Sequence, residues 1–265
     1  MIIGIVINKN KTIDSDLIEE ICSLIEYYGA KSKIDELENL EGSSLLVVLG
    51  GDGTILRASH YASWWDIPIL GLNTGTIGFL TDCNVEHGIS AIEAVLNNMN
   101  DGRPRQEYIE ERMMLEVVDS KLPRYERVVL NDVCFGQSGK LERFELTISN
   151  RFVDAIRADA LLVSTPTGST AYNWSAGGPL LYPYDNMYVV TPICPQSVTR
   201  PTVMSGTHCV SIGASGELDI ALDGKYKLKL NKGESLRVRA AKHRAKFVKS
   251  TPPNLYKILR KIKSI

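Results

Sequence analysis

The feature that most constrains the fold of this 265-residue chain is a short apolar run followed by a glycine-rich turn. Residues 45–49 form an unbroken run of leucine and valine, too short for a helix and typical of a buried strand. The next five residues, in which three glycines surround one carboxylate, are Gly50, Gly51, Asp52, Gly53 and Thr54. A helix is expected from about Ile55, and a helix N-terminus attracts phosphate. The pattern predicts a phosphate-binding loop at a strand end; the alternative is a tight turn with Asp52 as the helix N-cap.

The first hundred residues alternate strand and helix patterns. Strands are predicted at residues 2–7, 45–49 and 69–72. One helix is predicted at residues 14–28, ended by Gly29, and the second is the one after the glycine turn. A last helix is predicted from an apolar stripe made of Ile89, Ile92, Val95, Leu96 and Met99. This alternation is typical of an α/β domain with a parallel sheet, whose binding sites lie beyond the carboxyl ends of the strands.

The pattern changes after residue 104, where short runs that often alternate apolar and polar residues predict antiparallel strands. These runs lie at residues 113–118, 128–130, 144–149, 160–164, 187–190, 217–222, 226–230 and 235–240. Near the C-terminus, residues 254–265 carry apolar residues at helical spacing with lysine and arginine on the other side. This pattern predicts a helix that packs back on the first domain; the alternative is a basic amphipathic helix that contacts a membrane or nucleic acid. We therefore expect an α/β domain of residues 1–100, joined by residues 246–265, and a β-rich domain of residues 101–245.

Composition narrows the class of protein and its compartment. Lys and Arg number 30 and Asp and Glu 31, and this net charge of -1 does not indicate a nucleic-acid or membrane binder. The apolar N-terminus lacks the features of a signal peptide, and no stretch approaches the ~18 apolar residues of a membrane span. The five cysteines form no C-x-x-C pair, which favours reduced thiols over a zinc site or disulfides. We expect a cytoplasmic protein.

Two further segments bring polar groups to predicted strand ends. Residues 73–80 combine small residues with Phe79, which can pack on a base or a sugar; the alternative is a plain connection with Phe79 in the core. Asn131 and Asp132 follow the run at 128–130 and offer the donor and acceptors that suit ribose hydroxyls and an amide. Alone, these two residues are more typical of an ordinary turn than of a binding site.

The densest polar segment is residues 164–179. Seven of its first twelve residues carry hydroxyl groups, with glycine and proline between them, and Tyr172 and Trp174 add flat aromatic faces. Many neutral donors and acceptors suit a polar, sugar-bearing ligand. A Ser/Thr-rich linker, the alternative, would be longer and poorer in apolar flanks. Motifs of other enzymes are absent: there is no G-x-x-x-x-G-K-[ST], G-x-G-x-x-G, H-E-x-x-H or G-x-S-x-G.

Together these segments resemble the NAD kinase family. Four blocks match in the family's order, at residues 50–54, 73–80, 130–132 and 164–172. Residues 191–195, Arg200-Pro201 and Asp223-Gly224 match as well, so the resemblance extends from about residue 45 to 225. The glycine block alone also resembles diacylglycerol-type lipid kinases and phosphofructokinases, whereas the long Ser/Thr block is far more specific.

The resemblance implies phosphorylation of the 2′-hydroxyl of the adenosine ribose of NAD by ATP, giving NADP, with a divalent metal such as Mg²⁺. Some relatives also use inorganic polyphosphate. Asp52 would be the general base, within a phosphate loop formed by Gly50, Gly51, Gly53 and Thr54. The resemblance further implies NAD contacts at Asp52, Gly53, Phe79, Asn131, Asp132, Arg157, Asp159, Thr170, Ala171, Tyr172, Ser175 and Asp223. A homodimer or homotetramer is common in the family.

Two positions depart from the family pattern. Ala160 follows Asp159 where the family usually has glycine, and a methyl group there could shift the Asp159 backbone. Gln196 follows Cys194-Pro195 where members often have histidine. Two alternative functions stay open: a lipid or sugar kinase of the same broad fold, and a non-catalytic dinucleotide-binding module.

Overall fold

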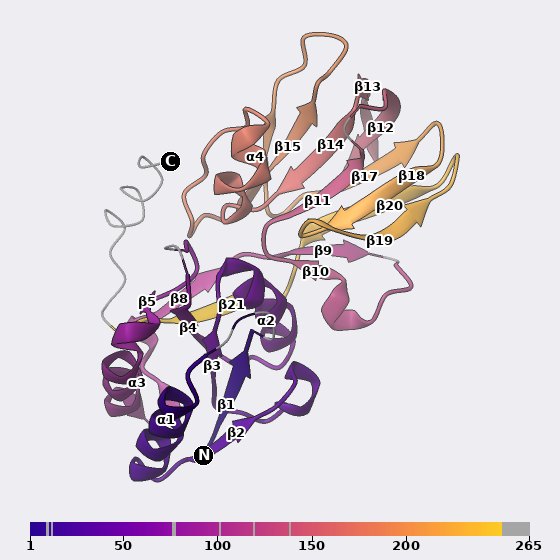
Figure 1. Ribbon diagram of the computed structural model, residues 1–265. Coiled ribbons are helices and arrows are strands. Elements are labelled where there is room, and N and C mark those ends of the chain that lie inside the picture. Colours follow the sequence, from indigo (N-terminus) through magenta and orange to yellow (C-terminus); the bar gives the residue numbers. More distant parts are fainter. Residues whose placement is uncertain are drawn as a thin grey trace. The chain divides into compact units, whose positions relative to one another are not determined.

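The chain divides into two compact units, Met1–Glu111 with the chain from Ala245, and Arg112–Arg244 (Figure 1). The computed structural model describes residues 1–8, 11, 13–75, 78–100, 102–118, 120–137 and 139–250. The helix predicted at residues 254–265 lies outside the described residues. None of the described helices is both long enough and apolar enough to cross a membrane.

The first unit is built on a mainly parallel sheet, as the sequence predicts. The strand order is β2-β1-β3-β4-β21-β8, with β5 pairing β4, and β1, β2, β3, β4 and β21 pair in parallel. The strands are β1 (Ile2–Ile7), β2 (Lys31–Ile34), β3 (Leu45–Leu49), β4 (Ile69–Asn73), β5 (Cys83–Asn84), β8 (Ile109–Arg112) and β21 (Ala245–Val248). The strands predicted at residues 2–7 and 45–49 have these bounds, and the third extends to Asn73.

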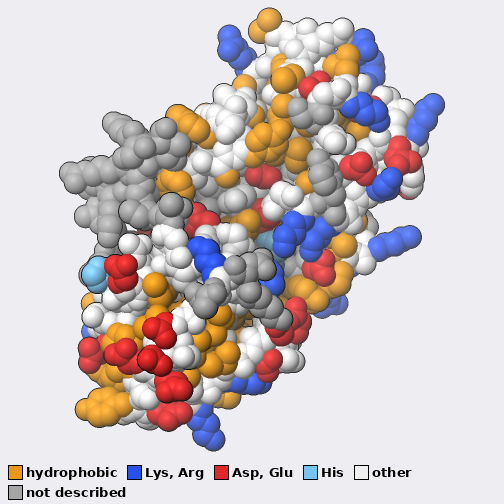
Figure 2. All heavy atoms as spheres, in the orientation of Figure 1, with side chains coloured by type: hydrophobic (Ala, Val, Ile, Leu, Met, Phe, Trp, Pro, Cys, Tyr) orange, Lys and Arg blue, Asp and Glu red, His pale blue; other side chains and the backbone are white. Residues whose placement is uncertain are grey.

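In the part of this unit that the structure describes, three α-helices cover the two faces of the sheet: α1 (Ser15–Tyr27), α2 (Asp52–Trp64) and α3 (Gly88–Asn97). Leu70 and Leu72 of β4 share a core cluster with residues of α1 and α3. Gly71 between them points the other way, where a Cβ would meet the Ile55 side chain of α2 at 2.4 Å. α1 and α3 therefore lie on one face and α2 on the other. The outer face of α1 carries acidic side chains, which Figure 2 shows gathered together.

Two helix boundaries differ from the sequence prediction. α2 was predicted from about Ile55 but begins at Asp52, with Gly51 as its N-cap, so Asp52 lies in the first turn and is not the cap. The glycines hide this start, because glycine is a poor helix former in general but tolerable at an N-terminus. Met99, predicted on the last helix, instead begins the two-residue strand β6 (Met99–Asn100), which pairs with β7 (Arg103–Pro104).

Among its described residues, the second unit contains two six-stranded antiparallel sheets. One has the order β10-β9-β20-β17-β12-β13 and the other β16-β15-β14-β11-β18-β19. The first contains β9 (Leu115–Val118), β10 (Val128–Val129), β12 (Glu142–Ile148), β13 (Arg151–Ala158), β17 (Cys209–Ala214) and β20 (Ser235–Ala240). The second contains β11 (Asp132–Gly136), β14 (Ala160–Ser164), β15 (Met187–Ile193), β16 (Thr202–Ser205), β18 (Leu218–Leu222) and β19 (Lys225–Leu230).

The core of the second unit lies between these sheets. Phe135 and Tyr188 of one sheet and Phe144 of the other are fully buried in a single apolar cluster. Residues between the inward positions, such as Cys134 and Leu162, form a smaller cluster on the outer face, against which Ala176 packs. β11 and β14 are therefore buried on both faces, which explains why every residue of both strands is buried.

Short helical turns join these elements. They are η1 (Leu37–Asn39), η2 (Val85–His87) and η3 (Gln106–Tyr108) in the first unit, and η4 (Arg124–Glu126), η5 (Gly168–Thr170) and α4 (Tyr172–Ser175) in the second.

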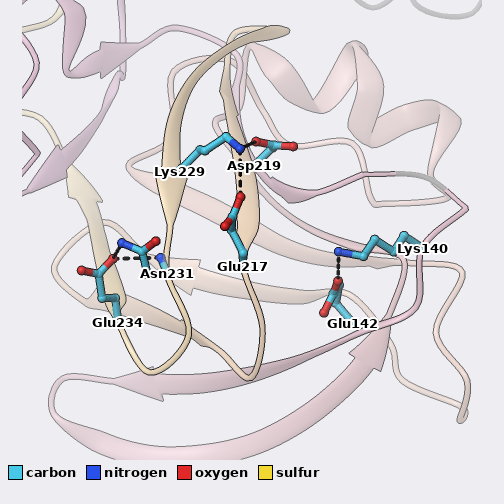
Figure 3. Close-up of polar contacts among 7 residues, drawn as sticks. All are labelled: Lys140, Glu142, Glu217, Asp219, Lys229, Asn231 and Glu234. Atoms are coloured by element: carbon cyan, nitrogen blue, oxygen red, sulfur yellow. Dashed lines mark hydrogen bonds and ion pairs between the residues drawn. The ribbon is translucent and has the colours of Figure 1, made fainter.

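The edge strand β19 of the second unit carries an exposed ion pair, in which Lys229 Nζ lies 2.8 Å from Glu217 Oε1 (Figure 3). Such a pair contributes little stability, but charge on an edge strand discourages pairing with another chain.

Candidate functional site

In the first unit, the carboxylate of Asp52 is held by the loop that follows β4. Its Oδ2 accepts a hydrogen bond from the Phe79 N–H at 2.8 Å, and its Oδ1 accepts one from the Leu80 N–H at 3.1 Å. A Cβ on Gly78 would lie 2.2 Å from Asp52 Oδ1, so this close approach requires glycine. The structure thus brings together the predicted residues Asp52 and Phe79 at the carboxyl ends of β3 and β4.

The glycines of the loop after β3 have different surroundings. A Cβ on Gly50 would collide with Thr54, whose Oγ1 would be 2.5 Å away, so Gly50 allows tight packing. A Cβ on Gly51 or Gly53 would meet no described heavy atom within 4 Å. Their backbone therefore faces open space at the N-terminus of α2, where a helix presents N–H groups and a partial positive charge to an anion.

Lys11 is a residue of this region that sequence reasoning missed. Its Nζ donates a hydrogen bond to the Thr74 carbonyl at 2.9 Å, which carries the ammonium from the loop after β1 to the loop after β4. A Cβ on Gly75 would lie 2.5 Å from this Nζ. A lysine just beyond the carboxyl end of a predicted parallel strand is the signal that could have identified it.

In the second unit, Asn131 and Asp132 belong to a turn that is held by Asp223, the residue directly after the neighbouring strand β18. Asp223 Oδ1 accepts hydrogen bonds from the N–H groups of Asn131 (2.8 Å) and Asp132 (3.0 Å), and its Oδ2 accepts one from the Leu130 N–H (2.9 Å). Asp223 has φ +47°, a left-handed conformation that is uncommon outside glycine. Asp223 was predicted to contact NAD. The structure shows that it also has a structural role, because its carboxylate holds the turn in place.

The beginning of the Ser/Thr block packs against the same turn. The Thr165 N–H donates to the Asn131 carbonyl at 2.8 Å, the Thr165 hydroxyl donates to the Leu130 carbonyl, and the Gly168 N–H donates to Thr165 Oγ1 at 3.0 Å. A Cβ on Gly168 would lie 2.1 Å from the Asn131 carbonyl oxygen. The hydrogen bonds of Thr165 and the small size of Gly168 therefore stabilise the packing of this block against the turn.

The later part of the block is fastened by Asn173, a residue absent from the predicted contacts. Its buried amide donates to the Pro179 carbonyl at 3.0 Å and accepts from the Thr191 hydroxyl at 2.7 Å. The flanking rings of Tyr172 and Trp174 stay 41% and 45% exposed. The predicted contacts Thr170, Ala171, Tyr172 and Ser175 therefore lie on an anchored loop that leaves flat faces open.

The structure does not bring Arg157 and Asp159 to the Asn131–Asp132 turn. Asp132 pairs with Ser164 at one end of β14, and Asp159 directly precedes the other end. Because a strand rises about 3.3 Å per residue, these ends lie roughly 13 Å apart. Asp159 instead accepts a hydrogen bond from the Gly139 N–H at 2.9 Å, and Arg157 is exposed on β13.

The two departures from the family pattern fit this end of the sheet without strain. Ala160 is the first residue of β14 and is buried in the outer cluster of that sheet. It does not have a positive φ, so its methyl group forces no change at Asp159, whose N–H donates to the Ile193 carbonyl at 3.0 Å. The Gln196 N–H donates to the Arg157 carbonyl at 2.8 Å, a backbone contact that any residue except proline can make.

Asp132 has the most perturbed carboxyl group of these residues. Burial raises the pKa of Asp132 to about 7, and the negative charge of Asp223 adds to the rise. Burial, with a smaller contribution from the charge of Asp132, also raises the pKa of the Cys134 thiol to about 12. A carboxyl group that gains or loses its proton near neutral pH can serve as either donor or acceptor towards a ligand.

Replacing Asp132 with Asn should make stability less dependent on pH. In the unfolded chain Asp132 loses its proton near pH 4, whereas the folded protein keeps it up to about pH 7. The free energy of unfolding therefore falls as pH rises through this window, by up to about 4 kcal/mol, and is flat above it. Asp132→Asn should remove this fall in urea titrations between pH 4 and 8. Asp219→Asn should retain it, because the Asp219 side chain on β18 is 44% exposed.

Within the described part of the chain, no three His, Cys, Asp or Glu side chains cluster to hold a metal ion. A single carboxylate at the glycine loop still suits Mg²⁺, which proteins commonly bind through one or two carboxylates together with substrate phosphates and water.

Family models match both parts of the chain. The model of the ATP-NAD kinase N-terminal domain matches residues 22–100, and that of the ATP-NAD kinase C-terminal domain matches residues 130–250. The NAD kinase of Methanothermobacter thermautotrophicus is 34% identical over 259 residues, covering 95% of this chain and 85% of the relative. The NAD kinase of Geobacter metallireducens is 35% identical over 252 residues, covering 91% and 87%.

Solved structures share the fold at lower identity. An NAD kinase from Archaeoglobus fulgidus in complex with ATP has a TM-score of 0.81 and 24% identity over the whole of both chains. Yeast NADH kinase complexed with NADH has a TM-score of 0.79 and 21% identity, covering 100% of this chain and 87% of that one. Because both family models match and relatives above 30% identity cover nearly its full length, this chain belongs to the NAD kinase family.

Proposed function

We propose that this chain is an NAD kinase, which transfers a phosphoryl group from ATP to the 2′-hydroxyl of the adenosine ribose of NAD and releases NADP and ADP. The observation that carries this proposal is the placement of Asp52 in the first turn of α2, held by two backbone amides beside an open glycine loop. An anion-binding backbone and one proton acceptor are two of the parts that phosphoryl transfer uses.

In this mechanism Asp52 is the general base. Its carboxylate accepts the proton of the 2′-hydroxyl as that oxygen bonds to the γ-phosphorus, and ADP leaves with the electrons of the broken P–O bond. The two amides fix the carboxylate, because each binds one of its oxygens. Phosphoryl transfer requires alignment and charge neutralisation more than covalent help from the protein.

The binding residues follow from the resemblance and from their placement. Gly53 and Phe79 line the nucleotide beside Asp52, while Asn131 and Asp132 hold the nicotinamide-side ribose and amide. The anchored loop with Thr170, Ala171, Tyr172 and Ser175 cradles the adenosine. Arg157 and Asp159, at the far end of β14, contribute dinucleotide contacts that are separate from the Asn131–Asp132 turn.

The metal is proposed to be Mg²⁺. When bound, it would neutralise charge on the donor phosphates. Among the described residues, Asp52 is the carboxylate of the glycine loop, and it could contribute one ligand to the metal. The oxygens of the donor would supply most of the remaining ligands. We also propose a cytoplasmic location. All five cysteines, which lie in the described residues, are free thiols, as is usual for proteins of that compartment.

A homodimer or homotetramer is proposed for the assembly. β13 stands at one end of its sheet in the described part of the chain and exposes Phe152 and Val153, which are 67% and 52% accessible. Apolar side chains on an edge strand favour pairing with a second copy. Light scattering that returns a 29.3 kDa particle at working concentration would contradict this assembly.

The test of the proposed function is direct. Purified protein is incubated with NAD, ATP and Mg²⁺, and NADP is read with an NADP-specific dehydrogenase. NADP formation is the expected result, and the same assay with polyphosphate measures donor preference. Phosphorylation of diacylglycerol without NADP formation would favour the lipid-kinase alternative, and tight NAD binding without turnover would favour a binding module.

Replacing Gly78 with Ala should lower kcat by at least about tenfold while the fold persists. The added Cβ would lie 2.2 Å from Asp52 Oδ1 and would push the base from its position, and small displacements of reacting groups cost large factors in rate. Gly213→Ala on β17 is the matched control, because its Cβ would make only ordinary contacts from 3.6 Å. Equal kcat values for the two variants would contradict this account of how Asp52 is held.

A further inference from the structure

Lys11 crosses the carboxyl end of the central strand of the first unit. β3 lies between β1 and β4 in the sheet (Figure 1). The Asn8 N–H donates to the Leu49 carbonyl at 3.0 Å, and the Gly50 N–H donates to the Leu72 carbonyl at 2.9 Å, so the three strands end side by side. A hydrogen bond from Lys11, after β1, to Thr74, after β4, must therefore pass over the start of the glycine loop, after β3.

The ammonium group of Lys11 retains capacity for a ligand. It makes no ion pair within the described residues, and its observed acceptor is a neutral carbonyl. An ammonium has three donors, so two remain. The neighbouring Thr74 hydroxyl is buried and has no hydrogen-bond partner among the described residues. Buried polar groups are usually paired, so an unsatisfied hydroxyl beside an uncompensated cation indicates a missing polar ligand.

The surroundings indicate that this ligand is an anion with several charges. The N-terminus of α2 and the open backbone of Gly51 and Gly53 face the same strand ends. Asp52 is the acid of this loop, and both of its oxygens are engaged by the amides of Phe79 and Leu80. A terminal phosphate chain would satisfy the ammonium, the hydroxyl and the helix amides together.

We propose that Lys11 binds the terminal phosphates of the phosphoryl donor. The identity of that donor rests on the proposed function. The ammonium group of Lys11 compensates negative charge on the phosphates while the P–O bond to the leaving group breaks and the bond to the acceptor oxygen forms. Such a contact distinguishes donors by the number of phosphates they carry, and inorganic tripolyphosphate satisfies it as ATP does.

The test is a calorimetric titration of the protein with ATP, ADP and AMP in the absence of NAD. Lys11→Met should raise the dissociation constant of ATP by about 10–100-fold, the loss expected for a charged hydrogen bond, and that of AMP by less than about twofold. Lys11→Arg should stay within about threefold of the wild type. Lys33→Met is the matched control: Lys33 is also exposed and donates to a backbone carbonyl, that of Asn39, at 2.6 Å.

Three results would overturn the proposal. They are unchanged ATP affinity in Lys11→Met, an equal loss of AMP affinity, and an equal loss in Lys11→Arg. Thermal unfolding of each variant identifies a general loss of fold. If Lys11→Met is destabilised, the ATP affinity of Lys11→Arg still shows whether a positive charge at this position contributes to ATP binding. Since the titration omits NAD, a protein that makes no NADP but loses ATP affinity in Lys11→Met would contradict only the proposed function. NADP formation with unchanged ATP affinity would contradict only the role of Lys11.

Discussion

Replacing Asp52 with Asn is expected to lower kcat for NADP formation by about 10²–10⁴-fold, the usual contribution of a positioned general base. An amide cannot accept the proton of the 2′-hydroxyl, while its size and shape leave the loop in place. KM for NAD and for ATP should change much less, because the acceptor of the proton matters mainly in the transition state. Initial rates over a matrix of NAD and ATP concentrations measure this.

The same substitution has a predictable structural cost. The carboxylate accepts from Phe79 through one oxygen and from Leu80 through the other, and an Asn side chain retains one of these two acceptors. Losing one such hydrogen bond costs about 1–3 kcal/mol. Asp66→Asn is the matched control, because it removes an exposed carboxylate of the same unit, paired with Lys246 at 2.6 Å. If Asp52→Asn kept the kcat of Asp66→Asn, the base would have to be another residue.

Most of the first unit could be predicted because its strands are covered on both faces. All five residues of β3 are buried, so the strand appears in the sequence as an unbroken apolar run next to a glycine turn. β2 was missed for the opposite reason. It is a short edge strand with two lysines, and its pairing with β1 is the interaction that makes it a strand.

In the second unit, the local sequence pattern does not show which segments form strands, because pairing between distant segments determines this. β13 has exposed residues at its first four positions, so it shows no alternation that would predict a strand. The Asn131–Asp132 pair is typical of a turn, yet Asp132 is also the first residue of β11, which β14 and β18 flank. The candidate site shows the same limit. Its glycine and hydroxyl blocks are visible in the sequence, but the roles of Asn173 and Lys11 depend on contacts between distant segments.

Replacing Asp223 with Ala should destabilise the protein by about 3–5 kcal/mol. The substitution leaves three N–H groups of the 130–132 turn without their acceptor, each at a cost of about 1–3 kcal/mol that water partly offsets. It also places alanine at φ +47°, a conformation that Asn and Gly tolerate better. KM for NAD should rise, because Asn131 and Asp132 lose their fixed position. Urea unfolding and NAD-dependent initial rates measure the two effects.

Asp223→Asn separates the clamp from the charge. Its amide oxygen can still accept from Asn131 and Asp132, so the stability loss should be about 1–2 kcal/mol, from the Leu130 contact alone. Removing the negative charge that faces Asp132 should lower the pKa of Asp132, although burial keeps it above its ordinary value. The fall of stability between pH 4 and 7 should then become smaller than in the wild type, because less proton binding distinguishes the folded from the unfolded state. Asp219→Asn, on the strand that ends just before Asp223, should leave that pH dependence unchanged. A wild-type slope in Asp223→Asn would mean that burial alone holds the proton on Asp132, and that Asp223 acts on the turn only through its hydrogen bonds.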